Sequence, residues 1–234
     1  MPSTIRTSAA AGNGGRYIGA VLALLVGVAL LAVGGPIALA ALEAAPGDDV
    51  ARDMRGRQPV GQEQLLRLVE TRRASLARYP DLERRRELAA ALSALAPLRT
   101  DPGPYLSAAA EQEREVLRLA PDSPADWLHL ALLQSAAGDD TAAVRLLSVA
   151  LLTGADMPRL RIGLLDLGFA LWPRLAGDTR SRLLQVIRHA WRGAARNERH
   201  ELLVTARSRN FLPLTVMVLS GEPGLEQALA RLGP

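Results

Sequence analysis

The feature that most constrains this chain is an uncharged apolar segment near its start. Residues 17–42 read YIGAVLALLVGVALLAVGGPIALAAL, hold no charged side chain, and lie between Arg16 and Glu43. As a helix, these 26 residues are about 39 Å long at 1.5 Å per residue, enough to cross a hydrocarbon core of about 30 Å. We therefore expect a single-pass protein with a tail at residues 1–16, a transmembrane helix at 17–42, a linker at 43–60 and a soluble helical domain at 61–234.

A cleaved signal peptide is the main alternative for the apolar segment. Residues 38–40, Ala-Leu-Ala, would serve as a small-residue cleavage site, and the Gly-Gly-Pro at 34–36 would break the helix before it. However, the continuous apolar run at 18–33 is long for a signal peptide, and only Arg6 and Arg16 precede it. We favour a retained anchor over a signal peptide, and both over a buried core helix.

Basic residues near the ends of the span indicate its orientation. Arg16 directly precedes the span, whereas the other side begins with Glu43 and has no basic residue before Arg52. This predicts that the amino terminus is in the cytoplasm and that the large domain lies on the other side of the membrane.

Charge is unevenly distributed along the soluble part. The chain has no cysteine, which excludes disulfides and thiolate chemistry, and all its basic residues except histidine are arginine. Residues 43–121 are balanced, residues 122–158 carry a net charge of −4, and residues 159–210 carry +7. A basic face of this kind suits an acidic partner protein, an anionic glycan or an anionic lipid, or it is simply a solvated helix surface. Outside the cytoplasm it has no nucleic acid to bind.

Apolar residues recur with helical spacing throughout the soluble part, and no window alternates with period two. The sequence therefore predicts an all-α fold, with a flexible stretch at 44–59 before the first helix. Capping residues and proline or glycine breaks give these expected helices: 62–78, a helix capped by Asp81 and ending near 96, 104–119, a hairpin within 124–156, 159–171, 179–192, a helix capped by Asn197, 211–220 and 225–232.

Residues 124–156 resemble one tetratricopeptide repeat, a 34-residue helix pair. The family pattern has an aromatic, a large apolar residue and three small residues at fixed positions. In this sequence those positions are occupied by Trp127, Leu130, Ala131, Ala143 and Ala150. Small residues let the two helices approach closely, and the aromatic fills the space between them. Ala155 departs from the pattern, which has a closing proline there, and Gln134 replaces a tyrosine. The resemblance implies a helical-hairpin solenoid; an unrelated helical bundle is the alternative.

The carboxyl-terminal part is similar to small membrane-anchored proteins of bacterial exopolysaccharide biosynthesis clusters. The similarity rests on Leu171, Trp172, Arg182, Arg188, Trp191 and Arg192. It implies a bacterial inner-membrane protein with its large domain in the periplasm and an accessory role in polysaccharide synthesis or export. It supplies no catalytic residues.

The sequence shows no arrangement typical of catalysis. His129, His189 and His200 have neither metal-ligand spacing nor evident carboxylate partners, and no nucleophile, metalloprotease or phosphate-loop motif is present. The arginine runs at 72–73 and 84–86 have acidic neighbours, which indicates local ion pairs on solvated helix faces. We expect no catalytic residue, no metal and no cofactor.

Together these features predict a non-catalytic, membrane-anchored scaffold that binds envelope proteins through its basic carboxyl-terminal face. The expected partner-binding residues are Arg159, Arg161, Trp172, Arg174, Arg188 and Arg192, with Trp172 expected to be the exposed tryptophan. An accessory subunit of cytochrome c maturation or pilus assembly is one alternative. A binder of anionic glycan or lipid is another.

Overall fold

The computed structural model describes residues 13–193 and 195–233, and within them it contains helices and no strand. This confirms the all-α expectation. The helices are α1 (Asn13–Ala44), a 3₁₀ turn η1 (Ala45–Gly47), α2 (Asp48–Arg55), α3 (Gln62–Arg78), α4 (Leu82–Leu95), η2 (Ala96–Leu98), α5 (Gly103–Leu119), α6 (Pro124–Ala136), α7 (Asp140–Gly154), α8 (Pro158–Ala170), η3 (Trp172–Arg174), α9 (Gly177–Gly193), α10 (Arg196–Ser208), α11 (Leu212–Val218) and α12 (Leu225–Leu232).

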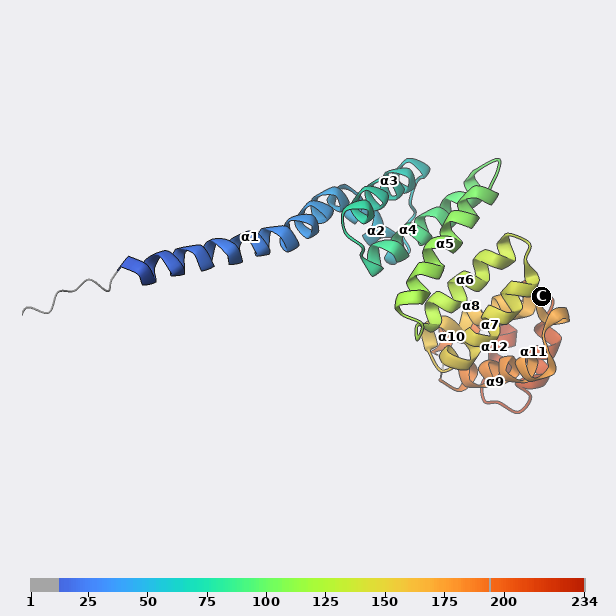
Figure 1. The fold of residues 1–234 in the computed structure, drawn as a ribbon. Coiled ribbons are helices and arrows are strands. Elements are labelled where there is room, and N and C mark those ends of the chain that lie inside the picture. The colour runs from blue at the N-terminus through green and yellow to red at the C-terminus, as the bar shows by residue number, and fades with distance from the viewer. Residues whose placement is uncertain (1–12, 194, 234) are drawn as a thin grey trace, which may run out of the picture.

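Helix α1 projects from the rest of the molecule as a free rod (Figure 1). Its large apolar side chains between Val21 and Val33 are all exposed, with Leu31 at 74%. The described part of the chain has one helix long and apolar enough to cross a membrane, and it is this one. Since no neighbouring helix covers the apolar surface of this rod, it matches the length and character of a bilayer span.

The carboxyl-terminal end of α1 packs onto the domain, chiefly against α3. Ala40 and Ala44 are buried there, and Glu43 accepts a hydrogen bond from Arg78 of α3 at 3.0 Å between Oε1 and Nε. The free rod and the packed end therefore belong to one continuous helix, with Pro36 inside it.

The stretch expected to be flexible, residues 44–59, is largely helical. The chain turns through η1 into α2, whose Val50 and Ala51 are buried. They belong to the first of two hydrophobic clusters, which is formed mainly by α2 to α5 and includes Leu68, Leu92 and Ala109. The expectation was wrong because an eight-residue helix is too short for its two buried positions to stand out from five charged neighbours.

Arg72 holds this junction together. It was expected on a solvated face, yet its side chain is 1% exposed. Its Nη1 donates to the Ala44 carbonyl of α1 at 2.7 Å, its Nη2 to Asp48 of α2 at 2.7 Å, and its Nε to Glu87 of α4 at 2.5 Å. One guanidinium from α3 thus ties three other helices together, and it satisfies a terminal carbonyl of α1.

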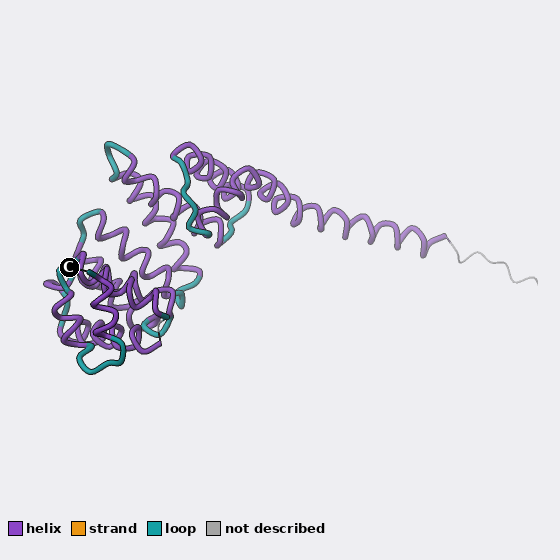
Figure 2. The backbone as a smooth tube through the Cα atoms, turned by 180° about the vertical axis from the view of Figure 1, so that it is seen from behind, coloured by secondary structure: helices purple, strands orange, loops and turns teal. Residues whose placement is uncertain are grey.

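From α3 to α7, consecutive helices pack one upon the next (Figure 2). In the α6–α7 hairpin, Ala131, Ala143 and Ala150 are fully buried, as close helix contact requires. Trp127 packs against both hydrophobic clusters of the protein and donates its Nε1 hydrogen to the Pro121 carbonyl at 2.8 Å. A hairpin at the expected place is confirmed; its interpretation as a tetratricopeptide repeat remains a prediction.

The carboxyl-terminal helices are arranged differently. Helix α10 packs against α8, α9, α11 and α12, so its neighbours are not only its sequence neighbours. The second hydrophobic cluster is formed by residues of α6 to α12, and Trp191 and Phe169 are buried in it. The Phe169 ring is stacked on that of Phe211, with the ring centroids 4.8 Å apart. This part of the protein is a small bundle attached to the row of stacked helices, at the end of the molecule opposite to α1 (Figure 1).

Candidate functional site

Four of the predicted partner-binding arginines make polar contacts within the chain, and the first of these is Arg161, which donates to the Asp156 carbonyl at 3.4 Å. Arg174 pairs with Asp140 at 3.1 Å, and Arg192 donates to Glu222 from both Nε and Nη2 at 2.8 and 2.6 Å. Arg188 donates to the Val218 carbonyl at 3.5 Å. Because Arg174 and Arg192 already have carboxylate partners, a ligand would have to compete with these carboxylates for them.

Trp172 is half-buried, contrary to the expectation of an exposed ring. Its ring meets Phe211 edge-on, with centroids 5.4 Å apart, and the guanidinium of Arg180 lies over it at 5.5 Å. Its packing against the second cluster makes it part of the fold. The sequence reading missed this because Phe211, its partner, is 39 positions away.

Arg159 and Arg161 line a shallow groove of about 420 Å³ that also includes Arg57 from the α2–α3 loop. Two carboxylates, Glu198 and Glu201, line the same groove and lower its net charge. The six predicted residues thus lie in three separate settings, and the structure does not bring them together as one face.

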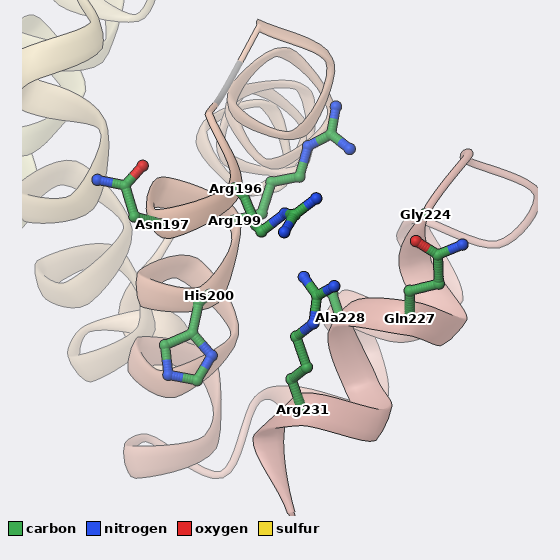
Figure 3. A pocket seen from close by; sticks show the side chains of 8 residues that line it. All are labelled: Arg196, Asn197, Arg199, His200, Gly224, Gln227, Ala228 and Arg231. Atoms are coloured by element: carbon green, nitrogen blue, oxygen red, sulfur yellow. The ribbon is translucent and has the colours of Figure 1, made fainter.

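Three arginines line a different groove, of about 720 Å³, between α10 and α12. Arg196, Asn197, Arg199 and His200 come from α10, and Gly224, Gln227, Ala228 and Arg231 from the start and body of α12. None of these eight lining residues is acidic. Figure 3 shows the side chain of Arg231 reaching from α12 across the groove toward α10, which carries Arg196 and Arg199.

Contacts with α9 and with the loop before α12 hold the Arg199 side chain in place. Its Nε donates to the Trp191 carbonyl at 2.9 Å, its Nη1 to the Pro223 carbonyl at 3.5 Å, and its guanidinium lies 5.1 Å from the centre of the buried Trp191 ring. Gly224 makes room for it: its φ of +81° is in the left-handed region, and an added Cβ would lie 3.3 Å from Nη1.

The loop before α12 is held by a second arginine. The hydrogen bond from Arg192 lowers the pKa of Glu222 below its ordinary value of 4.5, and the nearby charges of Arg188 and Arg199 act in the same direction. The two hydrogen bonds between Arg192 of α9 and Glu222 link the turn at 219–224 to α9.

His129 has a carboxylate partner that sequence reading did not find. Its Nδ1 lies 3.2 Å from Oε1 of Glu113, which is buried in α5, and His189 lies 3.8 Å from the exposed Asp156. Among the described residues, no group of three or more histidine, cysteine or acidic side chains is placed to hold a metal ion.

Sequence reasoning missed the α10–α12 groove because its charges come from two segments about 30 residues apart. Arg196 and Arg199 are one helical turn apart on α10, which could have suggested a local basic patch. Nothing in the sequence indicates that α12 rather than α11 lies beside them.

Comparisons of the chain with protein-family models, with curated proteins and with solved structures give no match.

Proposed function

We propose that this protein is a non-catalytic, membrane-anchored scaffold whose helical domain binds other envelope proteins. The observation that carries the proposal is the junction at Arg72. An apolar helix of membrane-spanning length continues without a flexible linker into the domain. Its Ala44 carbonyl accepts a hydrogen bond from Arg72, which also binds Asp48 of α2 and Glu87 of α4.

This geometry favours a retained anchor over a cleaved signal peptide. The small-residue site at 38–40 lies inside α1, and Ala40 is fully buried against the domain. A protease that removes residues 1–40 would need an extended, accessible chain there, and cleavage would remove a packed part of the domain.

A rigid junction is useful to a scaffold. A domain held at a fixed angle to the bilayer keeps the surface farthest from the membrane at a constant height and orientation. This raises the effective concentration of that surface for a partner confined to the same membrane. Modest contacts then suffice for stable association.

The test is crosslinking of the intact, carboxyl-terminally tagged chain in its native membrane, followed by identification of the proteins that co-purify. The resemblance to exopolysaccharide-cluster proteins leads us to expect a polysaccharide polymerase, transporter or glycosyltransferase subunit. Haem-lyase or pilus components would favour the alternative of cytochrome c maturation or pilus assembly. Recovery of lipid or glycan without any protein would overturn the scaffold proposal.

A further inference from the structure

Two of the three arginines that line the groove between α10 and α12 have no acidic partner among the described residues. Other arginines of the carboxyl-terminal part have acid partners, such as Arg192 with Glu222 and Arg209 with Asp166. Within the described residues, Arg196 and Arg231 form no such ion pair, and they face the same open space as Arg199 (Figure 3).

The walls of this groove are fixed before any ligand arrives. Arg199 is oriented by the Trp191 and Pro223 carbonyls, and Arg207 of α10 donates to the Leu232 and Gly233 carbonyls at 3.1 and 3.3 Å, which ties down the end of α12. A preorganised guanidinium loses little side-chain entropy on binding, and its planar fork matches a carboxylate with two parallel hydrogen bonds.

The position of the groove argues against lipid headgroups of the anchoring membrane. Helices α10 and α12 lie at the end of the molecule opposite to the free part of α1 (Figure 1). No tryptophan, tyrosine or phenylalanine lines the groove, so it lacks the broad stacking surfaces that bind sugar rings and bases most strongly, and His200 is the one aromatic ring among its lining residues.

The neutral side chains of the groove suit a peptide. Asn197 and Gln227 each carry an amide that can donate to a backbone carbonyl and accept from a backbone N–H, and Ala228 adds a small apolar surface. The arginines can bind acidic side chains of a peptide while the neighbouring amides bind its main chain.

We infer that the α10–α12 groove is the docking site for an acidic peptide segment of a partner protein, with Arg196, Arg199 and Arg231 binding its carboxylates. This inference rests on the proposed scaffold function and names the chemistry of its partner. Asn197 also lines the second groove, but Glu198 and Glu201 lie there, so the acidic segment is expected to stay within the α10–α12 groove.

The test uses the full chain in nanodiscs of neutral lipid and a short fluorescein-labelled peptide of alternating glutamate and glycine, followed by fluorescence anisotropy. We expect saturable binding that weakens as ionic strength rises. The double variant R196Q/R231Q should bind about tenfold more weakly, since each lost charge pair costs a few-fold in affinity. The control R145Q/R182Q removes the same charge from exposed arginines outside the groove and should stay within about twofold of wild type.

Inorganic phosphate, phosphatidylglycerol vesicles and oligogalacturonate are tested as competitors. The inference would be overturned if the peptide did not bind, or if the control variant lost as much affinity as the groove variant. It would also be overturned if vesicles or oligogalacturonate bound to the groove more strongly than the peptide does. If the peptide does not bind but proteins still co-purify in the crosslinking experiment, only the inference about the groove is refuted. Peptide binding with no co-purifying protein refutes the scaffold instead.

Discussion

Arg72 is the residue on which the geometry of the membrane junction most depends. It is nearly fully buried, and each of its partners belongs to a different helix, so no local ion pair can replace it. A buried charge is tolerated only when its hydrogen bonds are satisfied, and here three of them are.

We predict that R72M destabilises the protein. Methionine fills part of the volume but leaves the Ala44 carbonyl, Glu87 and Asp48 without their donor. Removing one partner of a buried pair costs about 3–5 kcal/mol, and the partial exposure of Asp48 places this case near the lower end. Urea unfolding of the detergent-solubilised chain, followed by tryptophan fluorescence, measures it. R73M at the exposed neighbouring position should change stability by less than about 0.5 kcal/mol; a similar loss in both variants would contradict the account.

The pair Arg192–Glu222 gives a pH-dependent contribution to stability. Because the pKa of Glu222 is lowered in the folded state, its stabilising effect is complete above the ordinary value of 4.5 and is lost as pH falls through the lowered pKa. We predict that R192Q has a lower denaturation midpoint than wild type at pH 7 and that the difference shrinks below about pH 4.5. Urea midpoints measured from pH 7 to pH 3 test this, and a difference that persists at pH 3 would show that the lost contact is not the ion pair.

At the scale of elements, the contact between α8 and α9 depends on a glycine. A Cβ added at Gly168 would lie 2.5 Å from Cδ2 of the fully buried Leu183, so the two helices touch where one has no side chain.

We predict that G168A destabilises the protein by about 1–2 kcal/mol, because overpacking of a tight core outweighs the gain of about 1 kcal/mol in helix propensity. The control G177A adds a methyl group at the start of α9, where nothing lies within 4 Å. Thermal unfolding compares the two variants. The double variant G168A/L183V should recover part of the loss, and a neutral G168A would show that the helices can separate without cost.

Most of the helices could be predicted because their end signals are local, but the cap expected at Asn197 was wrong. Asn197 lies inside α10, whose N-cap is Ala195, and Glu198 accepts from the Ala195 backbone N–H. The Asp81 side chain accepts from the Arg84 backbone N–H at 2.8 Å, as expected, and Asp139 accepts from Ala142 at 2.9 Å. The pairing of helices could not be predicted in the same way. Glu113 meets His129, and Arg86 of α4 meets Asp126 of α6, only because the tertiary packing brings these helices together. The candidate groove depends on such packing because Arg231 of α12 comes to lie opposite Arg196 and Arg199 of α10.

At the scale of the whole molecule, the fold separates two tasks. The apolar rod and the Arg72 junction lie at one end, and the basic groove lies at the other. The stacked helices from α3 to α7 connect them without a long loop, and Trp127 packs against the clusters on both sides. Packed helices therefore connect α10 and α12 to the apolar helix α1.

The orientation of the anchor is the remaining prediction, and the absence of cysteine makes it directly measurable. Arg16 before the span and acidic residues after it predict a cytoplasmic amino terminus. We expect S107C, at an exposed position of α5, to react with a membrane-impermeant maleimide in spheroplasts, and S8C in the amino-terminal tail to react only after lysis. Labelling of S8C in intact spheroplasts, with S107C protected, would reverse the orientation and place the basic groove in the cytoplasm. Persistence of the S8C label on the full-length chain would also show that residues 1–40 are retained, because a cleaved signal peptide would carry that label away.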